Sequence, residues 1–155
     1  MTKICDHTSV GILAWKEDKL LLIERKKFPF GFAVPAGHMD SDVSYEEAAI
    51  RELEEEVGLK SVDLELLIEG RKENPCRREN GDWHYWKIYR METKGEIQRS
   101  LDETKQAAYL SIDEIRQLGQ RTEKYLVGKI SEEEWEDSPG IEPVWYEWFR
   151  ELKII

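Results

Sequence analysis

The chain has 155 residues, which fits one domain with a substantial core. Its 33 acidic and 23 basic residues leave a formal net charge of −10, which argues against unspecific binding to nucleic acid or to an anionic membrane surface. Cys5 and Cys76 are too few for a disulfide framework and lack metal-type spacing. Without a signal peptide or an apolar run near about 18 residues, the sequence predicts a soluble, cytoplasmic protein.

Alternating apolar and aromatic residues between polar turns predict a series of strands along the chain. The first two strands are expected to form a hairpin across Lys16-Glu17-Asp18. The expected strands are residues 8–15, 19–26, 28–34, 62–69, 83–93 and 106–110, with a polar loop over residues 71–82.

A helix is expected from about residue 44 to residue 57. Ser44 is a good N-cap, Glu47 three residues later completes a capping-box pattern, and Gly58 stands where a left-handed residue would end the helix. At about 100° per residue, the apolar stripe of this helix should face the core and consists of Ala49, Ile50, Leu53 and Val57.

The end of the chain predicts further helices. Ser111 and Glu114 form a second capping-box pattern that starts a helix to about residue 118. After an acidic segment and a break at residues 138–140, residues 143–152 form an apolar stripe at helical spacing. This stripe is expected to pack on the core, and a partner or dimer surface is the alternative. Residues 1–155 are therefore expected to form one domain with a helical extension over about 120–155.

Three glutamates of the 44–57 helix are candidate metal ligands. Glu52, Glu55 and Glu56, at i, i+3 and i+4, fall on an arc beside the buried stripe, and Arg51 can reach Glu55 or Glu47. Carboxylate oxygens suit Mg²⁺ or Mn²⁺, and without a metal the crowded carboxylates should have at least one raised pKa. The alternative is a solvated acidic face.

The same segment resembles the signature of the Nudix family. Residues 51–59, Arg-Glu-Leu-Glu-Glu-Glu-Val-Gly-Leu, match the second half of the Nudix box, and Gly37 stands at the distance of the box glycine. The box would run from Gly37 to Leu59, and weaker flanking similarity covers residues 8–118. The chain departs from the pattern at Val43, where the family has a glutamate, and at Ala36, where glycine is usual. Asp40 or Asp42 are the carboxylates that can substitute near Val43.

The resemblance implies a Nudix-type α/β/α sandwich with a mixed sheet. It also implies hydrolysis of the pyrophosphate in a nucleoside diphosphate linked to another moiety, a nucleoside triphosphate included. Glu52, Glu55 and Glu56 would bind Mg²⁺, with Mn²⁺ as an alternative, Arg51 would orient them, and a backbone carbonyl near Ala36 or Gly37 would assist. The partner would be a small nucleotide derivative, and the protein a monomer or homodimer. A sensor module that binds a nucleotide without hydrolysing it is the alternative function.

Other residues are candidates for the chemistry around this helix. By the family resemblance, Glu103 binds metal or acts as general base, with Glu52 as the other base candidate and a surface position as the alternative for Glu103. Trp83 is a candidate for stacking on a nucleobase, with core packing as its alternative. Arg25 and Arg71, like the two arginines at 77 and 78, are candidates for phosphate contacts, with a solvated surface role as their alternative. The sequence shows no triad or zinc spacing among His7, His38 and His84.

Overall fold

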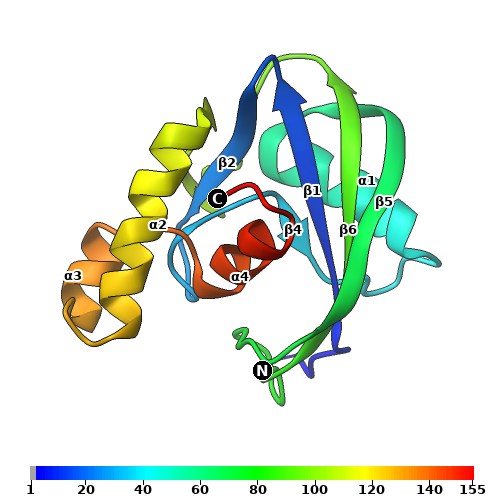
Figure 1. Ribbon diagram of the computed structural model, residues 1–155. Helices are drawn as coiled ribbons and strands as arrows, with labels where there is room; N and C mark the ends of the chain where they lie inside the picture. The colour runs from blue at the N-terminus through cyan, green and yellow to red at the C-terminus, as the bar shows by residue number, and fades with distance from the viewer. Residues whose placement is uncertain (1–2) are drawn as a thin grey trace.

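A mixed β-sheet lies between helical layers in the computed structural model, which describes residues 3–155 (Figure 1). The strands are β1 (Thr8–Lys16), β2 (Lys19–Arg25), β3 (Phe32–Ala33), β4 (Ala36–Gly37), β5 (Lys60–Lys72), β6 (His84–Lys94) and β7 (Thr104–Leu110). The helices are α1 (Tyr45–Val57), α2 (Ile112–Leu126), α3 (Glu132–Asp137) and α4 (Pro143–Glu151). The α/β sandwich with a mixed sheet is therefore confirmed.

The strand order is β3-β2-β1-β6-β5, with β4 paired to β1 and β7 paired to β2. β1 runs parallel to β6, and the other pairings are antiparallel. β1 and β2 pair only near their hairpin turn, at Trp15 with Leu20 and at Lys16 with Lys19. Beyond those residues, the short strand β4 bonds to β1, while β3 and β7 bond to β2. The sheet therefore opens between β1 and β2.

Side chains of β1 and β2 alternate between two apolar layers, because successive strand residues point to opposite faces. Leu13 and Leu22 pack in the layer that includes residues of α2 and α4. Ile12 and Ile23 pack in the layer that includes residues of α1. Figure 1 shows the same division, with α1 on one side of the sheet and the C-terminal helices on the other.

The ends of α1 follow the predicted capping. Ser44 Oγ accepts the backbone N–H of Glu47 at 3.1 Å, and Gly58 ends the helix with φ 72°. The reciprocal half of the box differs, because the Glu47 carboxylate accepts the N–H of Val43 instead of that of Ser44. The predicted burial of Ile50 is wrong. It is 39% exposed at the edge of the stripe, and Ala48 is buried in its place.

Several element bounds differ from expectation. The third strand covers only Phe32–Ala33, because Pro29 has no N–H to donate to a ladder. Strand β5 continues to Lys72, so Arg71 belongs to a strand and not to the loop. Helix α2 continues to Leu126 beyond the predicted end near residue 118, with the expected complete capping box at Ser111.

Helix α4 fills the apolar layer on its side of the sheet. Val144, Trp145, Trp148 and Phe149 are buried, as the stripe predicts. The Trp145 ring lies against the backbone of β1 at Gly11, where any Cβ would overlap the ring carbons. This contact needs glycine for space. The stripe is therefore packed inside the chain and is not a surface for a partner.

Candidate active site

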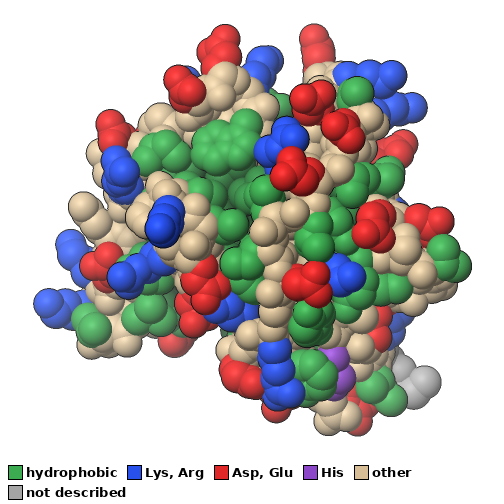
Figure 2. All heavy atoms as spheres, turned by 45° about the vertical axis from the view of Figure 1, so that its right-hand side comes forward, with side chains coloured by type: hydrophobic (Ala, Val, Ile, Leu, Met, Phe, Trp, Pro, Cys, Tyr) green, Lys and Arg blue, Asp and Glu red, His purple; other side chains and the backbone are tan. Residues whose placement is uncertain are grey.

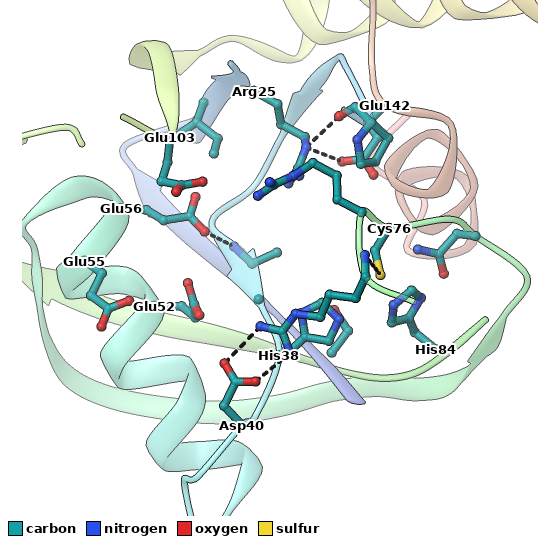
Figure 3. A pocket seen from close by; sticks show the side chains of 18 of the residues that line it. Arg25, His38, Asp40, Glu52, Glu55, Glu56, Cys76, His84, Glu103 and Glu142 are labelled. Carbon is teal, nitrogen blue, oxygen red and sulfur yellow. Dashed lines mark hydrogen bonds and ion pairs between the residues drawn. The ribbon is translucent and has the colours of Figure 1, made fainter. Parts of the chain in front are cut away.

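One cavity of about 770 Å³ gathers most of the residues that the sequence singled out. Glu52, Glu55 and Glu56 line it from α1, Arg25 lines it from β2, and Glu103 lines it from the segment before β7. Figure 3 shows Glu52, Glu55, Glu56 and Glu103 along one side of the cavity, with Arg25 and Glu142 together at another. The fold therefore places acidic and basic side chains around one space.

Arg51 holds two of the glutamates in place. Its Nη1 donates to Glu52 Oε1 at 2.9 Å and to Glu55 Oε2 at 3.1 Å. Its Nε donates to Asp42 Oδ2 at 2.8 Å, and its Nη2 donates to the carbonyl of His38 at 2.9 Å. The guanidinium therefore joins α1 to the loop before it. The predicted contact with Glu55 is present, whereas Glu47 bonds to Val43 instead.

Glu52 and Glu56 are the two carboxylates of the site whose pKa is raised by burial. Burial is the largest cause that raises the pKa of Glu52, which is about 7. The attraction to Arg51 lowers this pKa, and the repulsion from Glu55 raises it. Burial also raises the pKa of Glu56 well above its ordinary value, and the Glu52 carboxylate adds to the shift. The carboxylate Oε1 of Glu56 accepts the backbone N–H of Ala36 at 3.1 Å. A cation against these side chains would offset the burial of their charge.

The three carboxylates form an open arrangement. Within residues 3–155, no three of the acidic side chains bring one oxygen each within 4.8 Å of one another. Glu55 is 58% exposed at its side chain, whereas Glu52 is 13% exposed. Mg²⁺ is usually held by one or two carboxylates, several waters and substrate phosphates, so an open donor set of this kind fits it.

Gly37 gives Glu52 its position. A Cβ at this residue would overlap the Cδ and Oε1 atoms of the Glu52 carboxylate. The backbone of β4 therefore approaches the carboxylate directly, and only glycine leaves room there.

Val43, where the chain departs from the box pattern, lies outside the carboxylate cluster. This residue is 83% exposed. The two nearby aspartates have their own partners. Asp42 accepts from Arg51, and Asp40 accepts from Arg78 Nη1 at 2.6 Å and from Nη2 at 3.1 Å. Asp42 thus brings a carboxylate to the Arg51 network from the loop that contains Val43.

Of the predicted substrate contacts, Arg25 faces the cavity, whereas Arg71 and Trp83 lie outside its lining. Arg25 Nε donates to the carbonyl of Pro29 at 2.6 Å and lies 3.8 Å from Glu142 Oε1. Trp83 stacks on His7 with ring centroids 3.9 Å apart, and the Arg71 guanidinium lies 4.1 Å from the Trp83 ring centroid. These two residues therefore contact each other.

The cavity is also lined by residues to which the sequence assigns a low rank or no role. Arg77 and Arg78 come from the loop between β5 and β6, and the buried Trp86 and Trp145 form an apolar part of the lining. Glu142 is buried, and burial raises its pKa to about 7 while Arg25 lowers it. Glu142 lies far from the box in sequence. Its position directly before an apolar helix is that of an ordinary residue at a helix N-terminus, so the sequence holds no functional signal for it.

Glu103 lies at the cavity with a partner of its own. Its carboxylate is 3.4 Å from Lys27 Nζ, and its side chain is 49% exposed. Both the predicted base role and a surface ion pair are compatible with this position.

The comparisons with known proteins agree with this fold and site. A family model described as the NUDIX domain matches residues 6–128. An ADP-ribose pyrophosphatase of Methanocaldococcus jannaschii is 32% identical over 125 residues, which cover 77% of this chain and 72% of the relative.

Solved structures of hydrolases show the same fold. A NUDIX hydrolase from Nitrosomonas europaea has a TM-score of 0.60 at 27% identity, over 79% of this chain and 90% of that one. A MutT NUDIX hydrolase from Burkholderia pseudomallei has a TM-score of 0.61 at 24% identity, over 69% of this chain and 84% of that one. The chain belongs to the Nudix family, and it is an enzyme of the pyrophosphohydrolase class within it. The resemblance drawn from the sequence is confirmed.

Within residues 3–155, no helix has the length and apolar character needed to cross a bilayer. On the face that Figure 2 shows, basic side chains are interspersed with acidic and apolar ones and do not gather into one basic surface.

Proposed function

We propose that this enzyme hydrolyses the pyrophosphate of a nucleoside diphosphate linked to another moiety, with Mg²⁺ or Mn²⁺ as the cofactor. The observation that carries the proposal is the pairing of carboxylates and cations around one cavity. Glu52, Glu55 and Glu56 line one side of it, and Arg25 and Arg78 line it elsewhere. An anionic pyrophosphate needs both a metal and local cations in a chain of net charge −10.

Glu52, Glu55 and Glu56 are the residues that would hold the metal. When bound, a divalent ion supplies charge neutralisation at the phosphates and favours attack by water. The protein contributes orientation: Arg51 restrains Glu52 and Glu55, and the N–H of Ala36 restrains Glu56. This restraint supports the role of Arg51 as a positioning residue.

Glu103 is the proposed general base, because its side chain lines the same cavity beside Glu56 but comes from the segment before β7. In this role it accepts a proton from the attacking water, and Lys27 Nζ, 3.4 Å away, helps to hold the carboxylate in place. Glu52 is the second candidate. Its pKa of about 7 places it near the range in which a base works at neutral pH.

ADP-ribose is the first substrate to test. The relative from Methanocaldococcus jannaschii carries the name ADP-ribose pyrophosphatase, and a cavity of about 770 Å³ is within the usual range for a small-molecule site. Arg25 and Arg78 are proposed to contact the phosphates. Arg71 and Trp83 remain weaker proposals, since their cation–π contact lies outside the cavity lining. A nucleoside triphosphate is the second substrate class.

The test is a substrate panel with Mg²⁺ and with Mn²⁺, read by mass spectrometry. The panel contains ADP-ribose, nucleoside triphosphates, dinucleoside polyphosphates, NADH and coenzyme A. We expect ADP-ribose to yield AMP and ribose 5-phosphate, and isotopically labelled water to show which phosphorus is attacked. Glu56→Gln should abolish turnover, whereas Glu54→Gln, at an exposed position on the same helix, should not. An active Glu56→Gln variant would contradict the metal assignment.

A nucleotide sensor is the second candidate function, and the exposed Val43 is the observation that favours it. A sensor would bind ADP-ribose or a nucleotide in calorimetry and release no product from any member of the panel. Product release that requires Mg²⁺ and disappears in Glu56→Gln would exclude this function.

A further inference from the structure

Four side chains outside the carboxylate cluster converge beside the same cavity, and His38, Cys76 and His84 line it. They come from four separate segments: the N-terminal segment, the loop between β4 and α1, the loop between β5 and β6, and the first residue of β6. They are Cys5, His38, Cys76 and His84. One ligand atom from each lies within 4.8 Å of the ligand atoms of the other three. Figure 3 shows Cys76 and His84 on the side of the cavity away from Glu55 and Glu56.

The spacing of these atoms fits a tetrahedral metal. Cys5 Sγ lies 3.5 Å from His38 Nε2 and 3.4 Å from His84 Nε2. Around a tetrahedral zinc with Zn–S of about 2.3 Å and Zn–N of about 2.0 Å, a sulfur and a nitrogen are separated by about 3.5 Å. Two thiols with two imidazoles are also a donor set that selects zinc over the hard cations of a carboxylate site.

We propose that Cys5, His38, Cys76 and His84 bind a structural zinc ion. Binding forms two Zn–S and two Zn–N bonds, and the two thiols lose their protons to solvent, with no change in oxidation state. Four protein ligands leave no open position for substrate or water, so the site is structural and not catalytic. The proposal is independent of the hydrolase activity, since none of the four residues belongs to the carboxylate cluster.

A backbone N–H is directed at each of the two sulfurs. The N–H of His7 lies 3.3 Å from Cys5 Sγ, and the N–H of Arg78 lies 3.4 Å from Cys76 Sγ. Each amide is two residues after its cysteine. The loop closes tightly at Gly81, whose N–H donates to the carbonyl of Arg78 at 3.2 Å and where a Cβ would overlap Cys76 Sγ. The same loop geometry therefore places the sulfur and directs an amide toward it.

The two histidines are also ready to coordinate. Both rings direct Nε2 toward Cys5 Sγ, at 3.5 Å for His38 and at 3.4 Å for His84. His84 Nδ1 is buried and has no hydrogen-bond partner within the described chain.

A zinc ion here would fix the cavity wall opposite the carboxylates. The backbone carbonyl of His38 accepts a hydrogen bond from Arg51 Nη2 at 2.9 Å. Cys76 is two residues from Arg78, which forms the ion pair with Asp40. The ion would thus join the loop that orients the box helix to the loop that carries the basic residues.

The test begins with metal analysis of the full chain, produced with zinc in the medium and purified without chelator. We expect about one zinc per chain by mass spectrometry of the metal, and we expect it to remain in the double variant Glu55→Gln/Glu56→Gln. Zinc should be lost from Cys76→Ser and from His84→Gln. Protein without zinc after this preparation, or zinc that depends on Glu55 and Glu56, would overturn the proposal.

Two measurements on the unaltered chain keep the proposal testable if those variants do not fold. Replacement of zinc by Co²⁺ should give the strong d–d bands of a tetrahedral ion and a thiolate charge-transfer band. Titration of the two thiols with a mercurial should release zinc in step with their modification. A Co²⁺ spectrum without thiolate character, zinc that stays after both thiols react, or a Cys5–Cys76 disulfide in zinc-free protein would each refute it.

Discussion

Replacing Glu52 by glutamine is expected to separate the chemistry of this carboxylate from its effect on folding. Burial raises the pKa of Glu52 from an ordinary 4.5 to about 7. At about 1.36 kcal/mol per pKa unit, the buried charge destabilises the metal-free fold by up to about 3 kcal/mol above pH 7. The amide oxygen of glutamine can still accept from Arg51, so most of this destabilisation should disappear in the variant.

The sign follows from proton linkage. Between pH 4.5 and 7, the folded chain holds the Glu52 proton more tightly than the unfolded chain, so stability falls as pH rises through this window. Metal-free Glu52→Gln should therefore be more stable than the original chain at pH 8, with the difference shrinking toward pH 5. Turnover with Mg²⁺ should fall by about 10²–10⁴-fold if Glu52 is a metal ligand or base.

The assay is urea unfolding in chelator at pH 5 and pH 8, together with initial rates on the best substrate of the panel. Glu54→Gln is the matched control. It removes one carboxylate from an exposed position of the same helix and should change neither quantity measurably. A Glu52→Gln variant that is less stable than the original chain at pH 8, or that turns over substrate at the original rate, would refute the reasoning.

Three further substitutions test other parts of the site and core. Gly37→Ala should lower turnover by about 10²-fold, measured as kcat, because its Cβ would displace the Glu52 carboxylate. Gly11→Ala should lower the free energy of unfolding by about 1–3 kcal/mol in urea titrations, because its Cβ would overlap the Trp145 ring. Glu142→Gln should flatten the stability profile between about pH 5 and 7, where the raised pKa of Glu142 makes the original chain less stable as pH rises.

Gly70→Ala is the control for both glycine variants, since its nearest non-neighbouring atom would be 3.7 Å away at Trp148. A Gly37→Ala enzyme with the original kcat would show that the Glu52 position is not critical. A Gly11→Ala protein as stable as Gly70→Ala would show that the Trp145 contact can relax freely. An unchanged pH profile in Glu142→Gln would assign the pH dependence to other groups.

The box helix could be predicted closely because its signals are local. Ser44, the run of good helix formers and Gly58 act within the segment itself, and the structure has the helix between the two predicted caps. Ile50 shows the limit of helical periodicity. The spacing of about 100° per residue gives the direction of a side chain around the helix axis, but not the width of the surface on which the helix packs. Ile50 lies just beyond that surface.

The Cys5, His38, Cys76 and His84 group was out of reach of sequence reasoning. Zinc sites are recognised from sequence when ligands come in close pairs on one turn. Here the four proposed ligands come from four segments. The pairing of β1 with β6, the pairing of β1 with β4 and the bridge of Ile4 with Glu79 bring these segments together. The signal that was present is compositional: both cysteines of the chain and two of its three histidines take part.

The packing of α4 shows that the folding unit extends beyond the residues that match the family model. The family model ends at residue 128, yet Trp145, Trp148 and Phe149 supply much of the apolar layer beneath β1 and β2. A chain shortened to the matched segment would leave that face of the sheet open to water, and Trp145 would also be missing from the cavity lining. Chimeras that exchange loops or boxes between relatives should therefore carry the C-terminal helix with the sheet that it covers.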